Sequence, residues 1–269
     1  MSLFENGTLN LPGMTMDYIR FGRGKTPLVM IPGVGDGLRT VKGMAIPFAF
    51  LYRSLARDFT VYVFSRERQL SPKMSTREMA EHLNTALEAL GLSSVMAVGV
   101  SQGGMIAQWL AIDHPERIER LVLVVTLSRP NETVRQVIAR WIGMAERGDF
   151  RGIMQDTAER SYSEKRLRQM RRWYMLAGLF GKSSSMERFL IQAESCLTHD
   201  AYECLDRILC PTLVIGGEED QIVTGQASVE MAGRIPGAQL VMVEKLGHGL
   251  YEEAPDFLQR VQRFCLDGK

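Results

Sequence analysis

Short apolar runs alternate with helix-like patterns along most of this 269-residue chain, and this alternation limits the fold more than any other feature. Six runs are rich in Val and other apolar residues and are bounded by turn residues: 26–33, 59–65, 94–101, 120–126, 211–217 and 238–247. Their length and composition are typical of strands buried on both faces. Strands that alternate with helices predict the α/β class, with a mostly parallel central sheet and helices on both of its faces.

Helical patterns fill the gaps between these runs. Residues 75–91 begin with Ser75 three positions before Glu78, which is the spacing of a capping box, and they end on Gly91. Three more helices are predicted within 103–118, 224–237 and 254–268, the first of them ending at His114-Pro115.

The alternation stops after Thr126 and resumes at Pro211. The segment between them is rich in Arg, Met and aromatic residues and shows helical patterns without a strand. We therefore predict a core domain made of residues 1–127 and 207–269, with a helical cap (lid) inserted at 128–206. The length of the chain fits one α/β domain with one such insertion.

One serine lies where a predicted strand passes into a predicted helix. Gly99-Val100-Ser101-Gln102-Gly103 follows an apolar run and precedes a helical pattern. A Gly-x-Ser-x-Gly segment in this context is typical of a nucleophilic serine, whereas the same residues at a turn can also simply cap a helix. A serine hydroxyl attacks a carbonyl only with the help of a base, an acid that orients the base, and oxyanion donors.

Four histidines are candidates for the base. His82 is predicted on an exposed helix face, His114 at a helix end where it can bond the last carbonyls, and His199 at the surface or on a pocket rim. His248 differs because it lies between two glycines just after the last predicted strand. Loops at the carboxyl ends of strands are where ligands meet an open α/β sheet, so we predict His248 as the base.

The acid is expected in a loop after another strand. Glu218, Glu219 and Asp220 follow the predicted strand 211–217, while the strand 120–126 has no carboxylate near its end. The position in the loop leaves open which of the three acids acts.

Several segments together resemble the α/β-hydrolase superfamily, in its cap-bearing, lipase- and esterase-like branch: GVSQGG, HPERIERLVLV, PTLVIGGEED and GHGLYEEAPDFL. The resemblance covers nearly the whole chain and implies the α/β-hydrolase fold. It implies Ser101 as nucleophile and His248 as general base and acid. In the family the acid comes three residues after the glycine of a Gly-x-x-Asp segment, which implies Asp220.

The resemblance also implies an oxyanion hole made of two backbone N–H groups, those of Gln102 and Val34. The family commonly has His-Gly in the second of these loops, where this chain has Pro32-Gly33. Only the N–H of the donor residue matters, so a valine is acceptable there.

A further departure follows the run 59–65. The family usually carries Asp-x-Arg-Gly-x-Gly-x-Ser, and this chain has FSRERQLS at 64–71. Arg66 and Ser71 match the pattern, but its aspartate and both glycines are missing. We expect the turn beside the pocket to be reshaped.

A serine nucleophile argues against dehalogenases and epoxide hydrolases, which in this fold resemble one another in using an aspartate at that position. The implied activity is that of a carboxylesterase-type serine hydrolase, which cleaves an ester, thioester or lactone of a small to medium, largely apolar acyl substrate through an acyl-enzyme on Ser101. Alternatives on the same triad are cofactor-free C–C bond hydrolysis and perhydrolase-like acyl transfer. A ligand receptor with little turnover is a further alternative.

The cap offers apolar residues that either form its own core or line a pocket for the acyl group. They are Trp141, Met144, Met154, Trp173, Tyr174, Met175, Leu176, Leu179, Phe180, Met186 and Phe189. The basic run 163–174 forms either a solvated helix face or a site for an anionic substrate. Asp36 is expected either to stabilise a turn or to line the mouth of the pocket.

Composition excludes several other functions. A net charge of +1 predicts no nucleic-acid partner, and no metal site is predicted because the histidines lack ligand spacing. The mechanism needs no cofactor. The chain shows no signal-peptide pattern and no apolar run of about 18 residues, so we expect no membrane span and a cytoplasmic location. The four cysteines lack paired spacing and are expected as free thiols.

Overall fold

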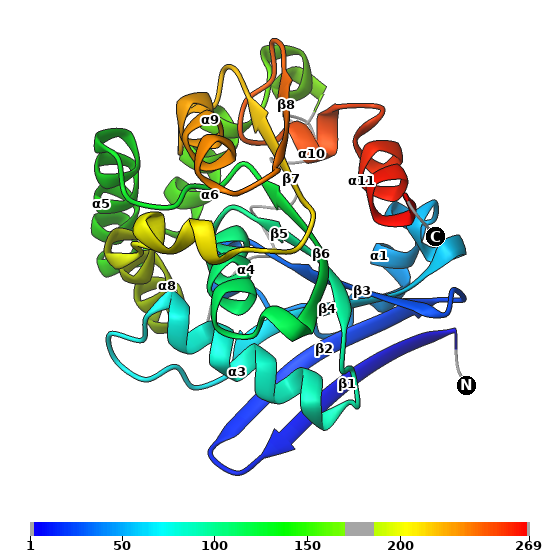
Figure 1. The fold of residues 1–269 in the computed structure, drawn as a ribbon. Coiled ribbons are helices and arrows are strands. Elements are labelled where there is room, and N and C mark those ends of the chain that lie inside the picture. The colour runs from blue at the N-terminus through cyan, green and yellow to red at the C-terminus, as the bar shows by residue number, and fades with distance from the viewer. Residues whose placement is uncertain (1–2, 170–185, 268–269) are drawn as a thin grey trace.

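A single sheet runs through the computed structural model, which describes residues 3–169 and 186–267 (Figure 1). Its described strands lie in the order β1-β2-β4-β3-β5-β6-β7-β8. They are β1 (Phe4–Leu11), β2 (Met14–Gly22), β3 (Thr26–Ile31), β4 (Phe59–Glu67), β5 (Val95–Val100), β6 (Ile118–Val124), β7 (Thr212–Gly217) and β8 (Gln239–Val243). Every pair from β4 to β8 is parallel, while β1 pairs with β2 and β2 with β4 in antiparallel fashion.

Two apolar layers cover the sheet, one on each face. Successive side chains of a strand point to opposite faces, so Val29 and Ile31 of β3 join one core cluster while Leu28 and Met30 join the other. The first cluster contains residues of α3 (Thr76–Ala89), α4 (Gln102–Asp113) and α9 (Gly225–Arg234). The second contains residues of α1 (Ala45–Leu51), α2 (Leu55–Asp58), α10 (Leu250–Glu253) and α11 (Phe257–Leu266). The predicted α/β-hydrolase fold is thereby confirmed.

Helix α3 shows why the local sequence folds as predicted. The Ser75 side chain accepts the N–H of Glu78, and the Ser75 N–H donates to the Glu78 carboxylate at 2.7 Å, which completes the capping box. Gly91, just past the helix, has φ of 69°, a conformation that favours glycine.

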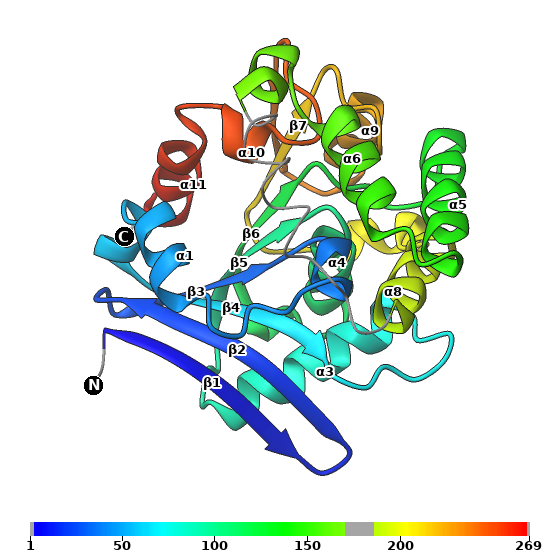
Figure 2. The ribbon, with the colours of Figure 1, turned by 180° about the vertical axis from the view of Figure 1, so that it is seen from behind.

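The described part of the predicted cap forms helices, with no strand among residues 128–169 and 186–206. These helices are α5 (Glu132–Glu146), α6 (Phe150–Ser161), α8 (Glu187–Thr198) and the start of a 3₁₀ helix η3 (Tyr202–Arg207). Figure 2 shows α5, α6 and α8 grouped on one side of the sheet. Arg171 and Arg172 of the basic run, and the apolar cap residues from Trp173 to Phe180, lie outside the described residues.

The remaining short helices are 3₁₀ turns, η1 (Val34–Gly37) and η2 (Pro115–Arg117). Among residues 3–169 and 186–267, no helix is long and apolar enough to cross a membrane.

Candidate active site

Ser101 occupies the sharp turn between β5 and α4. Its backbone has φ of 54° and ψ of −122°, a combination that costs a non-glycine residue about 1–3 kcal/mol. Two glycines make the turn sterically feasible. A Cβ on Gly103 would lie 1.9 Å from the carbonyl oxygen of Ile31, and a Cβ on Gly99 would lie 2.5 Å from that of Gly103. The Gly-x-Ser-x-Gly spacing is therefore what allows the chain to hold Ser101 in this strained conformation.

His248 and Asp220 meet from two neighbouring loops. His248 follows β8 and Asp220 follows β7, and their Nδ1 and Oδ2 atoms are 2.8 Å apart. The other carboxylate oxygen, Oδ1, accepts the backbone N–H groups of Ile222 and Val223. Gly217 lets the two loops approach, because a Cβ there would lie 2.5 Å from the carbonyl oxygen of Leu246.

These contacts keep Asp220 ionised. Burial alone would raise the pKa of its carboxyl group, but the charge and hydrogen bond of His248 and the two backbone donors outweigh burial and hold the pKa below 3.8. A carboxylate accepts hydrogen bonds only, so it favours a proton on Nδ1 of His248 and leaves Nε2 free to act as a base.

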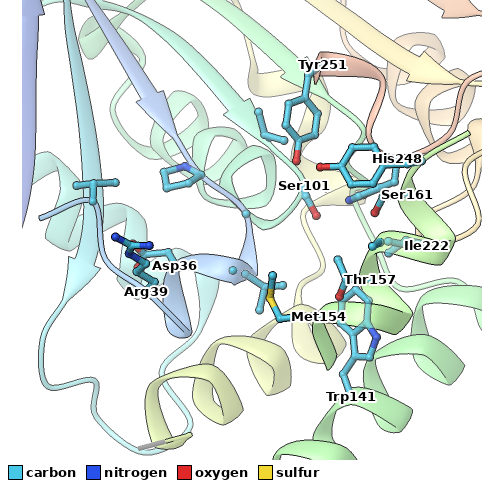
Figure 3. A pocket seen from close by; sticks show the side chains of 18 of the residues that line it. Asp36, Arg39, Ser101, Trp141, Met154, Thr157, Ser161, Ile222, His248 and Tyr251 are labelled. Carbon is cyan, nitrogen blue, oxygen red and sulfur yellow. The ribbon is translucent and has the colours of Figure 1, made fainter. Parts of the chain in front are cut away.

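Ser101 and His248 line one cavity of about 380 Å³ (Figure 3). No hydrogen bond joins the two side chains in the part of the chain that the structure describes. Without a substrate, such contacts are often long and tighten only in the complex, so the arrangement is compatible with catalysis.

The rest of the cavity wall comes from both the core and the predicted cap. Trp141 and Met154 line it from α5 and α6, as do Thr157 and Ser161. Three other apolar residues of the predicted cap pack instead in an apolar cluster that the cap helices share with the core domain: Met144, Met186 and Phe189. The wall is mainly apolar, which suits an uncharged organic group.

The two predicted oxyanion donors are each the first residue of a helix. Val34 begins η1 and Gln102 begins α4, and the first N–H groups of a helix have no acceptor inside it. The two helix starts are close, because a Cβ on Gly33 would lie 3.3 Å from Cβ of Ser101. The structure thus brings all five predicted site residues to one region, and their catalytic roles stay predictions.

Comparisons with known proteins agree with this arrangement. A family model described as "alpha/beta hydrolase fold" matches residues 26–255. The chain belongs to this family. It is 31% identical over 219 residues to 2-hydroxymuconate semialdehyde hydrolase of Pseudomonas putida, covering 80% of this chain and 77% of that protein. It is 26% identical over 215 residues to a putative carbamate hydrolase, RutD, of Caulobacter vibrioides, covering 75% of this chain and 76% of that one.

A solved structure shows the same fold over almost the full length. The enol-lactonase from Burkholderia xenovorans LB400 aligns with a TM-score of 0.83 at 20% identity, covering 97% of this chain and all of that one. Together with the curated relatives, the family match identifies the chain as a hydrolase of the α/β fold.

The other histidines of this α/β hydrolase lie away from the cavity. His199 was expected at the surface or on a pocket rim, and that expectation is wrong. It is 2% exposed, and its Nδ1 bonds the hydroxyl of Thr76 at 2.8 Å. His82 is one-third exposed and pairs with Glu67, and the ring of His114 bonds Glu81 rather than the last carbonyls of α4.

A buried polar cluster lies next to Ser101, and sequence reasoning offered only one of its members, Asp36, as a pocket residue. Asp36 lines the cavity and is buried, with Arg188 of α8 bonded to its carboxylate at 3.0 Å. Arg66 is also buried and bonds the Gln102 side chain. The sequence signals for this cluster were the match of Arg66 to the family pattern and the position of Asp36 in the loop after the first predicted strand. Strand β4 continues through Glu67, the position at which the family pattern has a glycine, and the reshaped turn stays a prediction.

Proposed function

We propose that this hydrolase cleaves carboxylic esters, thioesters or lactones through an acyl-enzyme on Ser101. The observation that supports this most is the strained Ser101 facing the same cavity as the His248–Asp220 pair. A strained serine, an oriented imidazole and an ionised carboxylate are the parts that nucleophilic attack on a carbonyl requires.

In the first half of the reaction, Oγ of Ser101 attacks the carbonyl carbon and Nε2 of His248 takes the hydroxyl proton. Asp220 stabilises the imidazolium that forms. The backbone N–H groups of Gln102 and Val34 donate to the tetrahedral oxyanion. When that intermediate collapses, the bond to the leaving oxygen or sulfur breaks and His248 gives its proton to the leaving group.

In the second half, water attacks the acyl-enzyme. His248 takes a proton from the water, the bond between the acyl carbon and Oγ breaks, and the proton returns to Ser101 as the carboxylic acid leaves. The site thus returns to its starting state without any cofactor.

The cavity supports a small to medium acyl group. Its volume of about 380 Å³ lies at the lower end of the usual range for ligand pockets. It has apolar walls, made by Met154 and Trp141 on the cap side and by Val41 and Phe48 on the core side. We therefore expect short or branched acyl chains to react faster than long ones.

A second candidate is hydrolysis of a C–C bond next to a carbonyl on the same triad. It is favoured by the 31% identity to 2-hydroxymuconate semialdehyde hydrolase, a relative whose name gives a semialdehyde substrate rather than an ester. Comparing turnover of p-nitrophenyl esters with turnover of a vinylogous diketone of similar size separates the two candidates.

The nucleophile is tested by incubating the folded protein with a fluorophosphonate and locating the adduct by mass spectrometry. We expect the label on Ser101 and not on Ser161, which lines the same cavity without the strained turn. Ser101→Ala should abolish labelling and lower p-nitrophenyl acetate turnover by about 10⁴-fold or more. Ser75→Ala, on the exposed start of α3, is the control and should label like the native protein. Unchanged turnover in Ser101→Ala would rule out the mechanism.

A further inference from the structure

Arg66 lies at the end of β4 and joins the two segments that carry the predicted oxyanion donors. Its Nη2 donates to the carbonyl of Pro32, two residues before Val34, and to Oε1 of Gln102 at 2.9 Å. One guanidinium nitrogen therefore links the loop before η1 to the first residue of α4. The two donor-bearing backbones also touch directly, because a Cβ on Gly103 would lie 2.7 Å from the same Pro32 oxygen.

The side chain of Gln102 extends this link to the cap. Its Nε2 donates to the carbonyl of Gln192 at 2.7 Å and to Oγ of Ser195 at 2.9 Å, both in α8. Because Arg66 can only donate, Oε1 must face the guanidinium, and this fixes the orientation of the amide. All three hydrogen bonds are buried, so the side chain of Gln102 is held rigidly although only its backbone N–H is expected to meet the substrate.

Helix α8 also holds the other donor segment, η1. Arg188 donates to the carbonyl of Asp36 at 2.9 Å and to its Oδ2 at 3.0 Å, and the same Oδ2 accepts the backbone N–H of Arg66. Gly37 packs against α8 so closely that a Cβ there would lie 2.6 Å from Cα of Phe189. Helix α8 thus contacts both helices whose first N–H groups form the predicted oxyanion hole.

Stability alone is a poor explanation for Arg66. Arg66 is 5% exposed, and its Nε and Nη1 bond no residue in the described ranges. Burial lowers the pKa of Arg66 to about 10, so it stays charged at neutral pH. A buried charge that lacks some of its hydrogen bonds is costly, and an apolar residue of similar size is often as stabilising or more so.

We propose that Arg66 and the side chain of Gln102 are positioning residues that set the spacing and direction of the two oxyanion N–H donors, with α8 as the support behind them. Neither side chain touches the substrate, and the inference rests on the proposed acyl-enzyme mechanism. Oxyanion donors act only within a narrow distance range, so a shift of one donor segment against the other lowers the rate of attack more than substrate binding.

The test compares Gln102→Met, which keeps the backbone N–H and the side-chain length, with Arg66→Met and Arg66→Lys. Arg117→Met is the control, because Arg117, just before the start of β6, is another buried arginine, bonded to Asn84, Glu88 and two backbone carbonyls. Steady-state turnover of p-nitrophenyl acetate is measured at a temperature where circular dichroism shows every variant to be folded. Inhibition is measured with a trifluoromethyl ketone, whose adduct with Ser101 carries an oxyanion, and with the matched secondary alcohol, which forms none.

We expect Gln102→Met and Arg66→Met to lower kcat by about 10- to 100-fold while KM changes by less than about threefold. The affinity for the trifluoromethyl ketone should fall by the same factor as kcat/KM, and the affinity for the alcohol should stay constant. Arg66→Lys should recover part of kcat, because an ammonium can also donate to both oxygens. Arg117→Met should lower Tm with kcat of the folded protein unchanged.

Native kcat and native ketone affinity in Gln102→Met would overturn the inference while leaving the acyl-enzyme mechanism intact. An equal loss of affinity for the ketone and for the alcohol would also overturn the inference, since that pattern indicates a general change of the pocket. If the native protein neither turns over the ester nor forms the ketone adduct, the proposed function fails and the inference fails with it. If Arg66→Met does not fold, the kinetics and inhibition of Gln102→Met alone test the positioning role.

Discussion

Two buried histidines of this hydrolase, His248 and His199, have nearly the same exposure but very different surroundings. His248 is 7% exposed and His199 is 2% exposed, and each uses Nδ1 in a hydrogen bond of 2.8 Å. His248 bonds a carboxylate and borders the cavity, whereas His199 bonds the hydroxyl of Thr76 and packs edge-on against Trp109.

The difference shows that burial alone does not make a histidine suitable for catalysis. A carboxylate stabilises the imidazolium that forms when a base accepts a proton, while a hydroxyl does so only weakly. An open face toward the cavity is equally necessary, because Nε2 must reach the nucleophile and the leaving group. Among these two histidines, only His248 has both features.

Replacing each histidine by asparagine is the strongest way to test this comparison. His248→Asn removes the base and should lower kcat for p-nitrophenyl acetate by about 10⁴- to 10⁶-fold. His199→Asn keeps a polar group near Thr76, and kcat of the folded protein should stay within about threefold of native. Similar losses in both variants would contradict the assignment of His248 as the base.

Replacing the hydrogen-bond partner of each histidine is the second test of their different roles. Asp220→Asn should lower kcat by about 10⁴-fold, because an amide no longer stabilises the charged ring and favours the wrong tautomer of His248. Thr76→Val should cost about 1–3 kcal/mol of unfolding free energy with little effect on kcat. Glu219→Gln in the loop of Asp220 is the matched control and should retain native activity. A loss in Glu219→Gln as large as in Asp220→Asn would reopen the choice of acid.

Sequence patterns predicted the strands from β3 to β7 because burial leaves a largely continuous apolar run. They also predicted β8 from its apolar run, but the expected burial on both faces is wrong there, because its residues are exposed or half-buried at the edge of the sheet. They missed β1 and β2, which had no prediction. The sequence of β1, FENGTLNL, carries polar residues and Gly, and in the sheet its side chains alternate between exposed and half-buried. An antiparallel edge strand that faces water on one side gives a much weaker signal than a buried parallel one.

The positions of Ser101, Asp220 and His248 could be expected because each follows a strand end that the sequence marks. The supporting contacts could not, because they join residues distant in sequence through packing. Gln102 and Ser195 are 93 residues apart, and Thr76 and His199 are 123 apart. No local pattern indicates which loop or helix will meet which, and this is also why His199 was placed wrongly.

The pH dependence of the unfolding free energy tests the apolar burial of His199 and is the smallest of the expected effects. Burial lowers the pKa of His199 from 6.5 to about 3, so the unfolded chain binds a proton between these values that the folded protein excludes. Above pH 6.5 the ring is neutral in both the folded and the unfolded protein, and the stability of the fold is at its full value. As the pH falls from 6.5 toward 3, only the unfolded chain gains the proton, and stability is lost.

We expect the unfolding free energy of the native protein to fall more steeply than that of His199→Asn between pH 6.5 and pH 4, by on the order of a few kcal/mol. The lowered pKa of Asp220 is common to the native protein and the variant, so its titration contributes equally to both curves and does not obscure the difference. Urea denaturation of both proteins at pH 7, 5.5 and 4 measures the effect, and parallel curves would show that the ring of His199 is protonated without cost in the folded protein.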